Sequence, residues 1–141
     1  MSEAVLDASV FVAAISPSEI HHDVARKLYD SWPEDQAFLV PSLFRVEVLA
    51  ALARRGEPNE LLDTVEVLVT GPRFHGIAID SSLIERATQV ARIARLRAYD
   101  AMYVALALNR DAVLLTLDSE VRAKMAEAFP NVKLATGLTS G

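Results

Sequence analysis

The chain has 141 residues, of which 52% are hydrophobic, a formal net charge of −5 and no cysteine. The length corresponds to one domain spanning 1–141, the hydrophobic content excludes disorder, and the absence of cysteine excludes disulfides, thiolate zinc sites and cysteine nucleophiles. The acidic balance argues against broad electrostatic binding to a phosphate backbone, so contact with a nucleic acid would need local basic patches or bound cations.

Short apolar runs alternate with helical patterns along the chain. Five runs predict buried parallel strands, at 4–6, 37–40, 76–79, 113–117 and 132–135. The segments between them predict helices, at 10–15, 20–32, 43–55, 59–69, 82–93, 98–109 and 119–129. This alternation predicts an α/β fold, a three-layer α/β/α sandwich with a five-stranded parallel sheet.

The N-terminus lacks the basic segment and unbroken apolar stretch of a signal peptide. The longest apolar runs, such as 101–108, are far shorter than the about 18 residues that a membrane span requires. We therefore expect a soluble protein, and the absence of cysteine fits a cytoplasmic location.

Four acidic residues stand inside otherwise apolar sequence: Asp7, Glu47, Asp100 and Asp118. A buried carboxylate is costly unless it has a hydrogen-bond donor, an arginine or a metal as partner. Sheets of this kind bind ligands at the carboxyl ends of their strands, and Asp7 and Asp118 follow predicted strands, as do Ser42 and Asp80.

Each of the four acids also has a purely structural explanation. Asp100 and Asp118 could cap helices, and Asp7 could be a turn or cap residue after the first strand. Glu47 could pair with Arg54, two helical turns further along. Taken together, however, the acids favour one hard-oxygen cage for Mg²⁺ or Mn²⁺, and hence metal-assisted phosphate chemistry.

Four segments of the chain resemble the signature segments of PIN domains, most closely those of VapC-type toxins from toxin–antitoxin pairs. They are VLDAS at 5–9, the helix with Glu47 in VEVLAALARRG, AYDAMYVALA at 98–107 and LLTLD at 114–118. The resemblance covers essentially the whole chain, and the four segments come in the order and spacing of the family.

The resemblance implies a site, matched position by position. Asp7, Glu47, Asp100 and Asp118 would be the metal ligands, and Ser9 and Thr116 the hydroxyl residues that support them. Ser119 and Glu120 follow the last aspartate, which leaves a fifth ligand open. The family's strand order, 3-2-1-4-5, would place Asp7 and Asp118 at the gap between strands one and four.

The resemblance also implies an activity and partners. The protein would be a metal-dependent endoribonuclease of a type II toxin–antitoxin system, with Mg²⁺ or Mn²⁺ as cofactor and RNA as substrate. It would form a homodimer and bind a VapB-like antitoxin that places an arginine or another blocking segment near the acids. Composition points the same way, because helix 59–69 is richer in apolar residues than a solvated helix needs.

Other residues suggest weaker hypotheses. Arg92, Arg95 and Arg97, just before Asp100, predict either a solvated helix end or a positive rim for a polyanionic substrate. His21 and His22 are interpreted as capping or packing residues. Trp32, Phe44 and Tyr103 are interpreted as core or interface residues rather than base-stacking platforms.

Three alternative functions compete with a nuclease. A receiver domain needs an acidic pair after strand one and a suitably placed lysine, and a dehalogenase-like phosphatase needs Asp-x-Asp there, whereas this chain has only Asp7. The remaining alternative is a PIN-like binding or assembly protein without turnover, which would have no need of all four acids.

Overall fold

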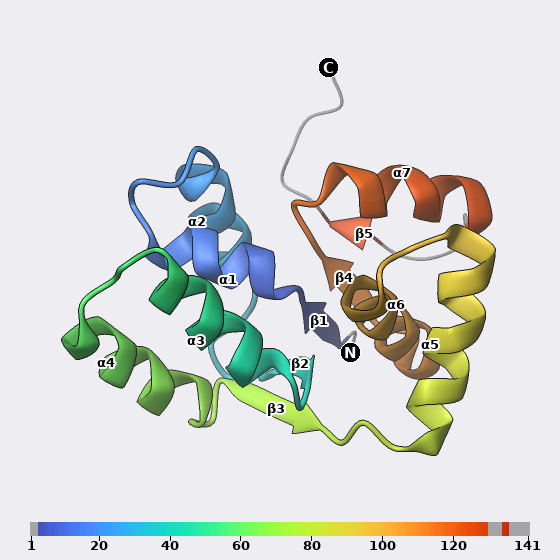
Figure 1. The fold of residues 1–141 in the computed structure, drawn as a ribbon, viewed down its shortest axis with the longest axis horizontal. Coiled ribbons are helices and arrows are strands. Elements are labelled where there is room, and N and C mark those ends of the chain that lie inside the picture. Colours follow the sequence, from blue (N-terminus) through green and yellow to red (C-terminus); the bar gives the residue numbers. More distant parts are fainter. Residues whose placement is uncertain (1–2, 130–133, 136–141) are drawn as a thin grey trace.

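The computed structural model describes residues 3–129 and 134–135, in which a five-stranded parallel sheet lies between two groups of helices (Figure 1). Its strand order is β3-β2-β1-β4-β5 and all neighbouring strands are parallel, so the predicted fold class and strand order are confirmed. The strands are β1 (Ala4–Leu6), β2 (Phe38–Pro41), β3 (Phe74–Ile77), β4 (Val113–Leu115) and β5 (Leu134–Ala135).

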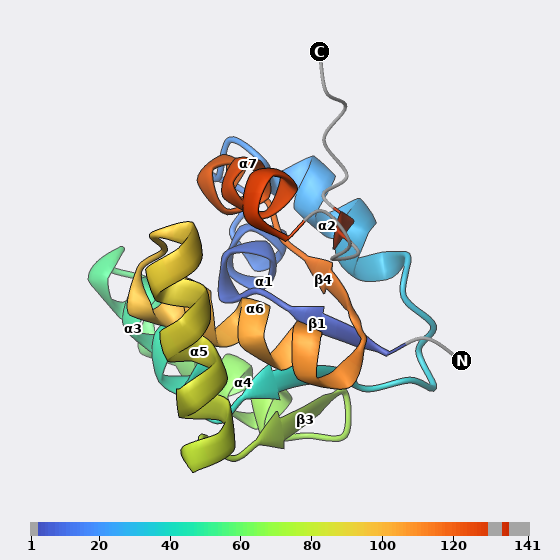
Figure 2. The ribbon, with the colours of Figure 1, turned by 90° about the vertical axis from the view of Figure 1, so that its right-hand side faces the viewer.

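Seven helices connect these strands in the described part of the chain. They are α1 (Ala8–Ile15), α2 (His22–Asp30), α3 (Phe44–Arg54), α4 (Asn59–Val69), α5 (Ser81–Ala94), α6 (Ala98–Arg110) and α7 (Ser119–Ala128). In Figure 1, α1 to α4 lie to the left of β1 and α5 to α7 to the right. Helix α6 contacts β1, β2 and β4, and Figure 2 shows it running beside β1.

The predicted segments all exist, but some boundaries differ. The third strand begins two residues earlier than predicted, because the backbone of Phe74 pairs in register with Phe38 of β2. The fourth strand ends at Leu115 rather than at 117, and the side chain of the next residue, Thr116, bonds Asp7. The first two residues predicted for the fifth strand, 132–133, lie outside the described residues.

An aromatic cluster joins α1 and α3 to the sheet. The ring of Phe11 lies 5.1 Å from that of Phe74, edge to face, and 5.8 Å from that of Phe44. Phe11, Phe38 and Phe44 are all fully buried, and aromatic pairs in such geometry stabilise a core beyond the area they bury. This cluster holds α1 and α3, which carry site residues, against β2 and β3.

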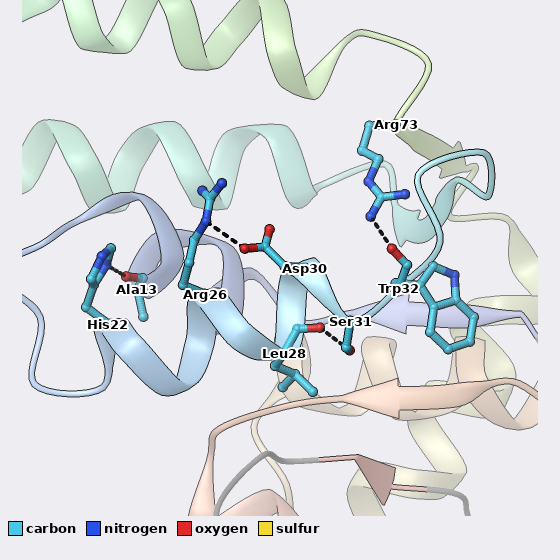
Figure 3. A network of polar contacts seen from close by, with 8 residues as sticks. All are labelled: Ala13, His22, Arg26, Leu28, Asp30, Ser31, Trp32 and Arg73. Atoms are coloured by element: carbon cyan, nitrogen blue, oxygen red, sulfur yellow. Dashed lines mark hydrogen bonds and ion pairs between the residues drawn. The ribbon is translucent and has the colours of Figure 1, made fainter.

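Arg73 ties the start of β3 to the loop that leads into β2. Its guanidinium donates hydrogen bonds to the carbonyl oxygens of Pro33, Gln36 and Trp32, at 2.5, 2.8 and 3.0 Å. It also lies 4.4 Å from the centre of the Phe38 ring. Figure 3 shows the bond to Trp32 beside the polar contacts of α2.

None of the described helices is long and apolar enough to cross a bilayer.

Candidate active site

A pocket of about 680 Å³ is lined by residues that directly follow β1 and β4, together with residues of α1, α3 and α6. Strands β1 and β4 are neighbours at the point where the strand order reverses, which is where open parallel sheets bind ligands. Five carboxylates line this pocket: Asp7, Glu19, Glu47, Asp100 and Asp118. The structure therefore brings the four acids that the sequence singles out into one place.

Strand pairing positions the first and last of these acids. The Asp7 N–H donates to the Leu115 carbonyl oxygen at 3.0 Å, so the β1–β4 ladder continues just beyond Leu6. The Thr116 hydroxyl, which is fully buried, donates to Asp7 Oδ2 at 2.8 Å and accepts a bond from the Asp118 N–H at 3.1 Å. Thr116 thus links the two aspartates through one side chain.

Both aspartates also cap helices. Asp7 Oδ1 accepts a bond from the Ser9 N–H at 3.2 Å at the start of α1. Asp118 Oδ1 accepts bonds from the N–H groups of Glu120 and Val121, at 2.9 and 3.1 Å, at the start of α7. The structural and functional interpretations of these residues are therefore compatible, because each cap also lines the pocket.

Glu47 enters the pocket from α3 and is held from α6. The Tyr103 hydroxyl donates to Glu47 Oε1 at 2.9 Å. Tyr103 is 2% exposed, which agrees with its interpretation as a core residue, yet its hydroxyl serves the site. The alternative that Arg54 pairs with Glu47 is not what the structure shows, since the hydrogen-bond partner of Glu47 is Tyr103. The spacing of Tyr103 three residues after Asp100, on one helical face, could have pointed to this role.

Burial and mutual repulsion raise the pKa values of three acids. Burial is the largest cause in each case; it raises the pKa of Glu47 to about 7 and that of Asp100 to about 6, with neighbouring carboxylates adding to the shift. The pKa of Asp7 is also raised by burial, although hydrogen bonds from Thr116 and Ser9 act against the shift. Asp7 repels both Glu47 and Asp100, so the pocket is electrostatically costly when its acids are ionised.

The chemistry of this donor set suits a hard divalent cation. Carboxylate oxygens are the ligands that Mg²⁺ and Mn²⁺ prefer, and a cation would offset the repulsion among these acids. As the side chains are placed, no three Asp, Glu or His residues of the described ranges are grouped closely enough to hold one ion. The carboxylates are therefore suitable ligands for a divalent cation, but at least one of these side chains would have to move toward the others to bind it.

The other predicted site residues are distributed unevenly. Ser9 lines the pocket, whereas Glu120 does not and instead pairs with Lys124 at 2.7 Å. Asp80 caps α5 by accepting a bond from the Leu83 N–H at 2.9 Å. Neither Asp80 nor Ser42 lines the pocket.

The arginines predicted as a substrate rim stand outside the pocket. Arg92, Arg95 and Arg97 are exposed, and none of them lines it. Arg97 still influences the site through its charge. That charge lowers the pKa of Asp100, although burial and the neighbouring carboxylates raise this pKa by more. The pocket's own cations are Arg54 and Arg55, at the end of α3, and Arg55 forms an ion pair with Glu19.

Five polar or aromatic lining residues were not part of the site predicted from the sequence: Glu19, His21, Arg54, Arg55 and Tyr99. Glu19 and His21 belong to the connection between α1 and α2, which only the folded chain brings to the pocket. His22 packs instead, with Nδ1 2.8 Å from the Ala13 carbonyl oxygen (Figure 3).

Comparison with known proteins places the chain in a family. The PIN domain family model matches residues 4–126. No curated protein matches the chain in sequence.

Solved structures share the fold. A toxin–antitoxin complex from Klebsiella pneumoniae superimposes with a TM-score of 0.71 at 17% identity, covering 96% of this chain and 98% of that one. VapC20 of Mycobacterium tuberculosis, a toxin that cleaves the sarcin-ricin loop, gives 0.72 at 17% identity over 86% and 94% of the two chains. VapBC2 of Rickettsia felis, bound to a promoter DNA fragment, gives 0.66 at 14% identity over 94% and 96%.

Proposed function

Because the chain belongs to the PIN domain family, we propose that it is a metal-dependent endoribonuclease and the toxin of a type II toxin–antitoxin system. The observation that carries this proposal is the convergence of Asp7, Glu47, Asp100 and Asp118 on one pocket at the β1–β4 reversal. The solved structures of similar fold include a toxin that cleaves the sarcin-ricin loop, which supports RNA as the substrate class.

The four acids would hold Mg²⁺ or Mn²⁺. When bound, such a cation lowers the pKa of a water and stabilises charge on phosphate oxygens. The chain's own residues orient the ligands: Thr116 fixes one oxygen of Asp7, and Tyr103 fixes one oxygen of Glu47. A hydrogen bond to the oxygen of a metal ligand sets the direction and basicity of that ligand.

The reaction would be hydrolysis by in-line attack. The water oxygen would form a bond to phosphorus while the bond from phosphorus to the 3′ oxygen breaks, and a proton lost by the water would end on the 3′ oxygen. The products are a 5′-phosphate and a 3′-hydroxyl.

The direct test is cleavage of an end-labelled single-stranded RNA by the purified protein. We expect cleavage with Mg²⁺ or Mn²⁺, none after EDTA treatment, and recovery when the metal is restored. The Asp7→Asn variant is the control for a contaminating nuclease. Undiminished cleavage in EDTA, or 2′,3′-cyclic phosphate ends, would contradict the mechanism.

A PIN-like binding protein without turnover is the second candidate. The observation in its favour is that the acids are not grouped as a ready three-ligand site in the described residues. The same assay separates the two functions, because a binding protein retains RNA without shortening it under any metal condition.

We further propose a homodimer and an antitoxin partner. Two of the solved structures of similar fold are toxin–antitoxin or VapBC complexes. On α4, the helix predicted to line a partner groove, Val67 is 73% exposed and Leu68 is 41% exposed, while Val65 and Val69 are buried. Light scattering at micromolar concentration tests the dimer; a persistent species of about one chain mass, 15.4 kDa, would refute it. Full nuclease activity of a purified toxin–antitoxin complex would refute inhibition by the partner.

A further inference from the structure

Tyr99 is an aromatic side chain at the pocket that the fold does not use. It is 59% exposed, and it is the only aromatic among the large hydrophobic side chains that the described residues leave exposed. It lines the pocket and directly precedes Asp100 in the first turn of α6. Because an exposed ring contributes little to core packing, stability of the fold does not explain an aromatic residue beside the acids.

Arg54 is a cation of the same pocket without an ionic partner in the described part of the chain. Its neighbour Arg55 is paired with Glu19, and Arg45, earlier on α3, is paired with Glu66. Arg54 lies seven residues after Glu47, so the two share a face of α3, and both line the pocket. Its exposed guanidinium is therefore available to an anion that reaches the acidic site.

We propose that Tyr99 and Arg54 form a subsite for one nucleotide of unpaired RNA next to the scissile phosphate. The Tyr99 ring stacks on a base, and the Arg54 guanidinium binds a backbone phosphate. This inference rests on the proposed function and adds to it the two side chains that hold the substrate strand beside the acids.

The chemistry of the pocket favours RNA over a protein as the ligand of these two residues. Single-stranded nucleic acids are bound by aromatic rings that stack on bases together with cations that follow the backbone, and Tyr99 and Arg54 supply one of each. Net charge is −5, so an RNA strand gains little from the surface as a whole and depends on such local cations.

Binding of a fluorescent single-stranded RNA of mixed sequence tests the ring. The measurement uses the full chain carrying Asp7→Asn, so that RNA is bound without being cut, with a duplex of the same sequence alongside. We expect Tyr99→Leu to weaken single-strand binding roughly tenfold, as loss of one stacked base does, and Tyr99→Phe to bind like its parent. Duplex binding should be weaker and insensitive to Tyr99, because the bases of a duplex are already stacked.

Salt dependence tests the arginine. Loss of one phosphate contact on a single strand reduces the slope of log K against log salt by about 0.7. We expect this change in Arg54→Gln, a preserved slope in Arg54→Lys, which keeps the charge, and a preserved slope in Arg45→Gln, which removes the same charge from α3 outside the pocket.

The outcomes distinguish failure of the proposed function from failure of the Tyr99–Arg54 subsite. If the unaltered protein neither binds nor cuts single-stranded RNA, the proposed function fails and this inference fails with it. If it cuts RNA but Tyr99→Leu and Arg54→Gln bind with unchanged affinity and slope, only this inference is wrong.

Discussion

The two edges of the sheet, where its strands begin and where they end, differ in how their charged side chains are paired. At the edge where strands begin, Arg73 donates three hydrogen bonds to carbonyl oxygens of the loop before β2, and its charge lies over the Phe38 ring. At the edge where strands end, Asp7, Glu47 and Asp100 repel one another and have raised pKa values. One edge is satisfied within the chain, whereas the other needs something that the chain does not supply.

This contrast teaches where stability and function reside in the molecule. Polar groups that are fully paired fix a loop and stabilise the fold. Carboxylates that repel one another destabilise it until a ligand of opposite charge binds. Substitutions at the two edges should therefore have opposite consequences, and the following predictions measure that difference.

The largest effect is expected from Asp100→Asn. It keeps the shape of the side chain but removes one ligand charge, so ribonuclease activity should fall by at least about a hundredfold, since even residues that merely support a ligand contribute about 10–100-fold. The melting temperature of the metal-free protein should stay the same or rise, because a repulsive charge is gone. Activity at the wild-type rate would remove Asp100 from the proposed site.

Arg73→Met should have the opposite effect from Asp100→Asn: a loss of stability without a loss of activity. Loss of three charge-assisted hydrogen bonds should lower the free energy of unfolding by about 2 kcal/mol, roughly thirtyfold in the folding equilibrium, with activity unchanged below the melting transition. Arg26→Met is the matched control at the same end of the molecule, because its ion pair with Asp30 is solvent-exposed and worth about 0.5 kcal/mol or less. Chemical denaturation measures both. Equal effects of the two variants would refute a special role for Arg73.

Tyr103→Phe should weaken metal binding about tenfold by freeing Glu47 Oε1 from its donor. The Mn²⁺ affinity can be followed by the loss of the free-ion paramagnetic resonance signal during titration, a readout that does not depend on turnover. Tyr29→Phe is the control, because Tyr29 packs against the core and does not line the pocket. An unchanged Mn²⁺ affinity would mean that Tyr103 only fills space.

The smallest effect concerns pH. The pKa of Glu47 rises from 4.5 to about 7 and that of Asp100 from 3.8 to about 6 on folding, so between these limits the folded state binds more protons than the unfolded state. Stability of the metal-free protein should therefore fall as pH rises from about 5 to about 8, by roughly 3 °C in melting temperature. Mn²⁺ added at the higher pH should reverse the fall. A metal-free melting temperature that rises over this range would contradict the pKa shifts.

Much of this architecture could be predicted from local pattern. Apolar runs such as 113–117 and the Gly71-Pro72 pair just after helix α4 are properties of a few adjacent residues, and such local patterns are sufficient to predict the number, type and order of the elements. The four acids could be found for a related reason, because a charge inside an apolar run stands out wherever the run folds.

The remainder depends on contacts between distant segments. The early start of β3 follows from its pairing with β2, and the partner of Glu47 lies 56 residues away on another helix. The arginine rim illustrates the same limit, since closeness of Arg92 and Arg95 to Asp100 in sequence does not bring them into the pocket, whereas Arg54 reaches it from α3.

The bond between Thr116 and Asp7 joins residues 109 positions apart, and this separation has a consequence for synthesis. A growing chain that has exposed Asp7, Glu47 and Asp100 still lacks β4's end, so neither Thr116 nor Asp118 can complete the pocket. For the ribonuclease proposed above, the site therefore assembles only after residue 118 has left the ribosome. Until then the emerging chain would lack the complete site and could not cut the RNA that encodes it.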